Sequence, residues 1–259
     1  MKITILLLMF LCLLKKIGVE SLKNSTTTVT PRIVGGHLAD VGQFPFQVGI
    51  VHITEGLLCG GTILTEWWIL SAAHCFEHNY RGRYDVVVGS VDLTMGKEYT
   101  VAMIVMHKNY ETDTIENDVS LVKLKTSLIF DSLVSPIKLD HRNIEIVECT
   151  AIGWGQTSFY YEKPAMVLNY INLYTIRNSE CQDLYMAYAG KDIADSNICT
   201  MSMSGGTGTC YMDSGGPLIA NGKQIGIVSF GAKCGVYPDV YTRISYFYHW
   251  IHDTMQQYN

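Results

Sequence analysis

A ten-residue stretch late in the chain has the residue types of a nucleophilic site. In Gly208-Thr-Cys-Tyr-Met-Asp-Ser-Gly-Gly-Pro217, Ser214 follows Asp213 and precedes two glycines. Glycine lets the backbone turn sharply and approach a ligand closely. A serine hydroxyl is a weak nucleophile on its own, so it needs a nearby base, and the base needs an orienting group. The stretch therefore predicts a histidine and a buried carboxylate elsewhere in the chain.

Two other segments supply these groups. His74 ends the run Leu70-Ser-Ala-Ala-His, and Asp118 follows Asn117 at the start of an alternating apolar run. Alone, an Asp-Ser-Gly-Gly sequence is an ordinary turn and a histidine next to a cysteine is structural. Together, in the chain order His, Asp, Ser, they predict nucleophilic catalysis. Ser214 attacks a carbonyl, His74 takes and returns the proton, and Asp118 orients the imidazole.

These motifs, with Arg32-Ile-Val-Gly-Gly36 ahead of them, resemble the chymotrypsin-like serine proteases over residues 33–259. The resemblance implies an all-β fold of two antiparallel six-stranded β-barrels with a C-terminal α-helix. The site would lie in the cleft between the barrels, and the amides of Met212 and Ser214 would stabilise the oxyanion. The resemblance implies no metal and no organic cofactor.

The start of the chain predicts a secreted protein. Lys2 followed by the apolar run 3–14 is typical of a signal peptide, which we place at about residues 1–20. The run is too short to span a bilayer comfortably. Residues 21–32 are polar and would form an activation propeptide, in which Asn24 begins a glycosylation sequon.

The resemblance also implies activation by cleavage. In the family, the peptide bond that corresponds to Arg32–Ile33 is cut, which frees the amino group of the residue that corresponds to Ile33. That group forms a buried ion pair with the aspartate before the nucleophile, here Asp213. Burying a carboxylate without a partner is costly, so the uncleaved chain is expected to be an inactive precursor.

Charge restricts the class of partner. Residues 33–259 have 14 basic and 23 acidic residues, a net charge of −9, which argues against nucleic acid and an anionic membrane. The resemblance implies a monomer that meets protein or peptide substrates, an activating protease and protein inhibitors.

Two alternatives to a protease are an esterase and a binding protein without turnover. The chain order and the missing Gly-x-Ser-x-Gly motif argue against an α/β-hydrolase esterase. A catalytically weak or inactive homologue acting as a binding protein stays open, because Met212 stands where the family has glycine.

Seven cysteines follow residue 32, and in an oxidising compartment most of them should pair. Their spacing does not suggest a zinc site. The resemblance implies the bridges Cys59–Cys75, Cys181–Cys199 and Cys210–Cys234. Some family members join a cysteine at position 149 to one shortly after the nucleophile. Ala220 occupies that second position here, so we expect Cys149 to be a free thiol.

Short apolar runs broken by Gly, Asn and Asp favour strands throughout the chain. We expect strands at 44–51, 57–64, 67–71, 84–89, 99–105, 118–124, 149–155, 170–176 and 224–231. Residues 125–146 are interpreted as the linker between the barrels. A short helix is expected over 179–188 with Ser179 as its N-cap, and an amphipathic helix over 245–257.

The specificity pocket is expected to differ from that of trypsin. By resemblance it is formed by Gly208, Thr209, Ser229, Phe230, Gly231 and Asp239, and an extended substrate would pair with the backbone of 229–231. Gly208 replaces the floor aspartate of Lys- and Arg-specific members, and Asp239 stands at a wall position that is commonly glycine. Some arthropod chymotrypsin-like and collagenolytic enzymes have a similar exchange. We expect a chymotrypsin-like or broad preference, for Leu, Phe, Tyr and Met with some basic cleavage. In the alternative, Asp239 turns away from an ordinary apolar slot.

Overall fold

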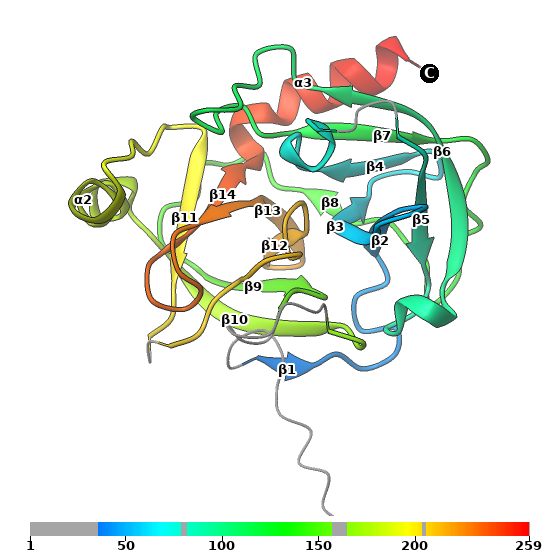
Figure 1. Cartoon of the computed structure of the whole chain (residues 1–259), viewed down its shortest axis with the longest axis horizontal. Helices are drawn as coiled ribbons and strands as arrows, with labels where there is room; N and C mark the ends of the chain where they lie inside the picture. The colour runs from blue at the N-terminus through cyan, green and yellow to red at the C-terminus, as the bar shows by residue number, and fades with distance from the viewer. Residues whose placement is uncertain (1–35, 79–81, 157–164, 204–205, 259) are drawn as a thin grey trace, which may run out of the picture. The chain divides into compact units, whose positions relative to one another are not determined.

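The computed structural model describes residues 36–78, 82–156, 165–203 and 206–258 (Figure 1). The predicted signal peptide and propeptide, with Arg32 and Ile33, lie outside the described residues. None of the described helices is long and apolar enough to cross a membrane.

Six antiparallel strands form a closed first barrel. They are β2 (Gln47–His52), β3 (Gly56–Ile63), β4 (Trp68–Ser71), β5 (Tyr84–Val88), β6 (Lys97–Met106) and β7 (Ser120–Leu124), in the order β2-β3-β4-β7-β6-β5. Buried aliphatic residues such as Ile50, Ile69 and Leu121 fill its core. Because side chains alternate across a strand, the apolar positions of each strand collect inside the barrel.

The second barrel also closes with six strands. They are β9 (Glu148–Gly153), β10 (Asn169–Ile176), β11 (Asn197–Met201), β12 (Pro217–Ala220), β13 (Lys223–Gly231) and β14 (Asp239–Arg243). β9 pairs with both β10 and β12, which closes the ring. Two short strands extend it: β1 (His37–Leu38) pairs with β10, and β8 (Lys138–Leu139) runs parallel to β13.

Helix α3 (Ile244–Gln257) links the two barrels. It follows β14 of the second barrel (Figure 1), yet its buried residues Ile244, Phe247 and Ile251 belong to the core of the first. The expected all-β fold of two six-stranded barrels with a C-terminal helix is therefore confirmed.

Local details differ from the sequence-based expectation. The helix expected at 179–188 is α2 (Asn178–Ala189), and Ser179 is not its N-cap, because the helix begins earlier, after Arg177, without a side-chain cap. The Asn178 side chain instead donates to the carbonyl oxygens of Ala194 and Asn197. The predicted linker contains β8, and Asp118 precedes β7 rather than starting it.

Candidate active site

His74 and Asp118 meet through two hydrogen bonds. His74 begins the 3₁₀ turn η1 (His74–Phe76), three residues after β4. Its ring Nδ1 lies 2.8 Å from Asp118 Oδ2, and its main-chain N–H donates to Asp118 Oδ1 at 2.9 Å. The two bonds fix the imidazole orientation and leave Nε2 available for proton transfer.

The second barrel holds the same aspartate. Ser229 Oγ on β13 donates to Asp118 Oδ2 at 2.6 Å, and Thr242 Oγ1 on β14 donates to the Asp118 carbonyl oxygen at 2.7 Å. Asp118 is only 1% exposed. Both barrels are therefore needed to place the carboxylate.

The pKa values of the pair move in opposite directions. Burial opposes ionisation of Asp118, but the charge of His74 and the hydrogen bonds from His74 and Ser229 outweigh it and lower the carboxyl pKa. Burial also disfavours the charged form of His74, but attraction to Asp118 outweighs it and raises the imidazole pKa. The pair thus favours an ionised carboxylate that can stabilise an imidazolium.

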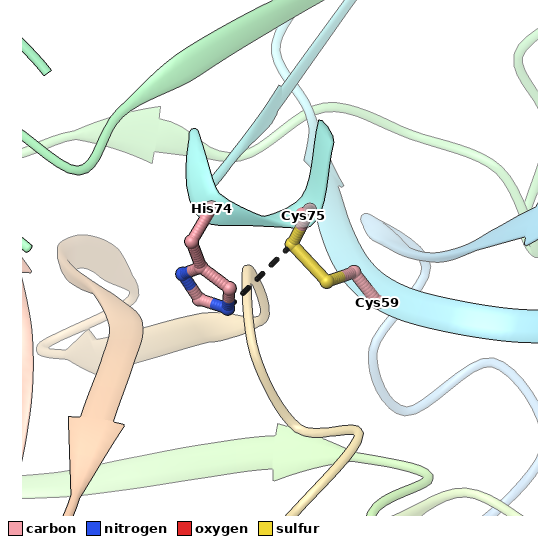
Figure 2. Close-up of side chains that lie close together, drawn as sticks. All are labelled: Cys59, His74 and Cys75. Carbon is pink, nitrogen blue, oxygen red and sulfur yellow. Dashed lines mark hydrogen bonds between the residues drawn. A yellow bond between two sulfur atoms is a disulfide. The ribbon is translucent and has the colours of Figure 1, made fainter. Parts of the chain in front are cut away.

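A disulfide lies against the histidine. Cys75 Sγ is 4.0 Å from His74 Nε2 and is bonded to Cys59 of β3 (Figure 2). These three residues offer metal-ligand atoms within 4.8 Å of one another. Because the two sulfurs are bonded to each other, neither is a thiolate ligand. The bridge instead ties η1 to the wall of the first barrel.

Ser214 lies on a loop packed against the first barrel. Its carbonyl oxygen accepts the N–H of Gly60, at 2.8 Å. The next residue, Gly215, has a positive φ of 76°, and a Cβ there would collide with Ser71 Oγ and the Gly60 carbonyl. Only glycine permits this approach, which brings the Ser214 loop against the strand end that precedes His74.

The backbone before Ser214 is strained. Met212 has φ 72°, a left-handed conformation that favours glycine. Among the described residues, no acceptor pairs with the main-chain N–H of Met212 or Ser214. Two amide donors thus remain available beside the serine.

The chain is similar to known proteins in sequence and in structure. The trypsin family model matches residues 33–251. Trypsin II-P29 of Gallus gallus is 34% identical over 236 residues, 88% of this chain and 90% of that protein. Trypsin V-A of Rattus norvegicus is 34% identical, over 87% and 90% of the two chains. The structure of neuropsin, a serine protease expressed in the limbic system of mouse brain, matches with a TM-score of 0.77 and 30% identity, over 85% and 99%.

The chain belongs to the trypsin family. It is a serine endopeptidase, and its substrates are proteins.

In this trypsin-family chain, Asp213 is fully buried beside the serine. The N–H groups of Gly155 and Cys210 donate to its two carboxylate oxygens at 2.8 and 2.9 Å. Burial raises its pKa to about 7 despite these bonds. No cation forms an ion pair with it within the described part of the chain.

A cavity of about 210 Å³ opens next to Ser214. Of the residues expected by family resemblance, Thr209, Ser229, Phe230 and Gly231 line it. A larger cavity of about 640 Å³, around Arg243, contains none of the predicted site residues. The catalytic chemistry therefore points to the smaller cavity.

Two predicted pocket residues do not line this cavity. Asp239 is only 6% exposed, and its Oδ2 accepts the N–H of Thr209 at 2.7 Å. Gly208 is buried against it, since a Cβ at Gly208 would lie 2.8 Å from that oxygen. Burial raises the pKa of Asp239 to about 7. The carboxyl thus lies behind the cavity wall, bonded to it.

Sequence reasoning missed one residue near the cavity and four that line it, which are Tyr211, Val228, Ala232 and Lys233. The residue near the cavity is Lys191, which lies over the ring of Phe230. Tyr211 and Lys233 adjoin Cys210 and Cys234, so the predicted disulfide could have placed them. No motif marks Lys191.

The disulfides are those that the resemblance implies. Cys181 of α2 is bonded to Cys199 of β11, and Cys210 is bonded to Cys234, both of which line the cavity beside Ser214. Cys149 is a free, buried thiol.

Proposed function

We propose that the chain is the secreted precursor of an endopeptidase that cleaves peptide bonds through an acyl-enzyme on Ser214. The observation that carries the proposal is Asp118, bonded to His74 and held by side chains of both barrels. Such a pair has one established use beside a serine, which is to take and return its proton.

The proposed reaction uses these three residues in turn. Ser214 Oγ attacks the carbonyl carbon while His74 Nε2 accepts its proton, and the oxyanion binds the amides of Met212 and Ser214. The C–N bond then breaks, and the leaving amine takes the proton from His74. Water, deprotonated by His74, hydrolyses the ester and restores Ser214.

Activation rests on the buried carboxyl of Asp213. Cleavage after Arg32 would supply an ammonium at Ile33, the cation that a buried carboxylate needs. Ionised and paired, Asp213 would fix the backbone of Met212 and Ser214 between the two amide donors. The uncleaved chain is then an inactive precursor that needs an activating protease.

We also propose secretion as a monomer, with protein inhibitors as further partners. Three disulfides are typical of proteins from oxidising compartments, which supports secretion through a signal peptide at about residues 1–20.

For the residue before the scissile bond we propose a chymotrypsin-like or broad preference, similar to that of some arthropod members. Of the described residues that line the cavity beside Ser214, none has a carboxylate. Asp239 is bonded to Thr209 behind the wall, so it is a poor anchor for a long basic side chain. Asp239→Gly is therefore expected to leave the preference unchanged, whereas better cleavage after large aromatics with loss of residual cleavage after Arg would show that this carboxyl acts in the pocket. Cleavage profiles on a denatured protein mixture test this, and strict cleavage after Lys and Arg by the wild type would contradict it.

A serine-directed fluorophosphonate probe tests the activity itself. We expect labelling of the wild type after trypsin cuts behind Arg32, and none before. Arg32→Gln should stay folded and unlabelled, and Ser214→Ala should stay unlabelled after cleavage. No labelling of cleanly cleaved wild type would instead favour a binding protein without turnover, an outcome that strain at Met212 makes worth testing.

A further inference from the structure

Lys191 places a positive charge over an aromatic ring of the cleft. Its Nζ lies 3.8 Å from the centre of the Phe230 ring. Phe230 lines the cavity together with Ser214 and follows Ser229, the residue that donates to Asp118. The ammonium therefore lies on a ring that belongs to the same cavity as Ser214.

Several interactions fix this lysine. Helix α2 ends at Ala189, and the left-handed backbone of its C-cap residue, Gly190 (φ 59°), turns the chain just before Lys191. After Lys191, Asp192 accepts a hydrogen bond from Gln182, and the N–H of Ile193 donates to Gln182 at 2.6 Å. The residue is thus held on both sides by α2, which reduces the entropy lost when it binds a ligand.

The ring beneath it is fixed as well. Tyr185 of α2 packs edge-on against Phe230, with ring centres 5.9 Å apart, and its hydroxyl donates to the Pro238 carbonyl at 2.8 Å. The disulfide Cys181–Cys199 anchors the same helix to β11.

No carboxylate neutralises Lys191 directly. Within the described ranges it forms no ion pair, and Asp192 next to it is bonded to Gln182. Burial lowers its pKa, while attraction to Asp118 and Glu116 partly restores it. Asp118 is already engaged with His74, so among the described residues Glu116 is the carboxylate that competes for Lys191. A partly desolvated charge of this kind attracts an anion more strongly than an exposed lysine does.

The adjoining strand edge is open. The pairing of β13 with β12 ends at Ile227, whereas its pairing with β14 continues to Gly231. An extended peptide could therefore add to the free edge of 229–231, with alternate side chains over Phe230.

We propose that Lys191 is a specificity-determining residue that selects substrates with an acidic side chain shortly before the scissile bond, at the position that lies over Phe230. The inference rests on the proposed function, because it assumes a peptide in this cleft.

Peptides that differ only by Glu or Gln test the proposal. Glu is moved through the second, third and fourth residues before the cleaved bond, and kcat/KM is compared with that of the Gln peptide. We expect a preference for Glu of about three- to tenfold at one position, falling as salt rises. Lys191→Met, which keeps the length of the side chain, should reduce the ratio to about 1, and Lys191→Arg should retain it.

A matched control is available in the first barrel. Lys97 Nζ lies 4.8 Å from the centre of the Tyr99 ring, the same kind of pair away from the cavity. Lys97→Met should leave the Glu/Gln ratio unchanged, whereas Glu116→Gln should increase it. A ratio near 1 in the wild type, or one that Lys191→Met does not change, overturns the proposal.

Binding separates this proposal from the catalytic one. Affinities of the Glu and Gln peptides for cleaved Ser214→Ala can be measured by calorimetry. Tighter binding of Glu that depends on Lys191, without turnover in the wild type, would support the inference and overturn the proposed function. Equal binding of the Glu and Gln peptides, with normal turnover in the wild type, would overturn the inference and support the proposed function.

Discussion

Asp118 and Asp213 are both 1% exposed, yet their carboxyl pKa values move in opposite directions. The pKa of Asp118 is lowered, because His74 and Ser229 outweigh its burial. The pKa of Asp213 is raised to about 7, because two backbone N–H groups do not offset its burial. Burial alone therefore does not decide the charge of an aspartate here; a charged partner does.

This difference divides the site into two regions. The His74–Asp118 region is complete, with each polar atom of the carboxylate bonded. The region around Asp213, which includes Met212 and Asp239, holds two carboxyls with raised pKa values and a strained backbone. The first two predictions below change the bonded carboxylate of the first region, Asp118, or test the effect of the missing cation at Asp213 in the second.

The largest effect is expected from Asp118→Asn. The amide keeps the size of the side chain but stabilises the wrong tautomer of His74 and no longer supports an imidazolium. We expect kcat to fall about 10⁴-fold, with KM little changed. Steady-state kinetics on a peptide substrate measure this. A fall of less than tenfold, in a folded variant, would show that His74 does not depend on Asp118.

The second prediction concerns the pH dependence of the uncleaved chain. With a native pKa of about 7 against an ordinary 3.8, Asp213 binds more protons in the folded than in the unfolded state between these values. The free energy of unfolding therefore falls as pH rises through this window. In the uncleavable Arg32→Gln chain, the free energy of unfolding should therefore fall between about pH 5 and pH 8. Adding Asp213→Asn to this chain should remove about 3 kcal/mol of that fall.

Urea unfolding across this pH range measures the difference. Asp239→Asn is the matched variant, because its carboxyl pKa is also raised to about 7. Asp118 contributes no such slope in this range, because its carboxyl pKa is lowered below 3.8 and the stability that it gives is lost only as pH falls below that value. Parallel pH profiles with and without Asp213→Asn would contradict the contrast between the two aspartates.

Met212→Gly is expected to have a smaller effect. A residue other than glycine at φ 72° costs about 1 kcal/mol. By family resemblance we also expect the side chain to crowd the leaving-group side of the cleft. We expect kcat to rise by about two- to fivefold, or sensitivity to bulky inhibitors to relax. Rates on several substrates measure this, with Met95→Gly, an exposed residue outside the site, as control. Unchanged or lower rates on all of them would count against it.

The smallest effect is expected at Cys149. Burial raises the pKa of this thiol to about 12, so it stays neutral and needs no charged partner. We expect no alkylation by iodoacetamide at pH 8 in the folded protein and complete alkylation after unfolding. Peptide mapping without reduction checks both points. Rapid labelling of the folded protein, or a disulfide involving Cys149, would show the assignment to be wrong.

How far the sequence predicts the molecule depends on whether a feature is local. The barrels follow from alternating runs, and the Ser214 and His74 segments are short motifs in a fixed order. Positions set by barrel closure do not follow in this way. The bond from Ser229 to Asp118 joins residues 111 positions apart, and Lys191 reaches Phe230 through the end of α2.

Asp239 shows the same limit on a finer scale. Its position in the chain predicts a place in the pocket wall, but the direction of its side chain depends on the hydrogen bond that it accepts from the N–H of Thr209. The backbone bond turns the carboxyl behind the wall, an outcome that residue types alone do not determine.

The pairing of β1 with β10 has a kinetic consequence. His37 is held opposite Tyr170, and Ile33 lies four residues before it, so an amino group at Ile33 can reach at most about 14 Å from this anchor. Such a tether gives the amino group an effective concentration on the order of millimolar around its anchor. Its capture by Asp213 would then be a first-order event, with a rate independent of how dilute the protein is.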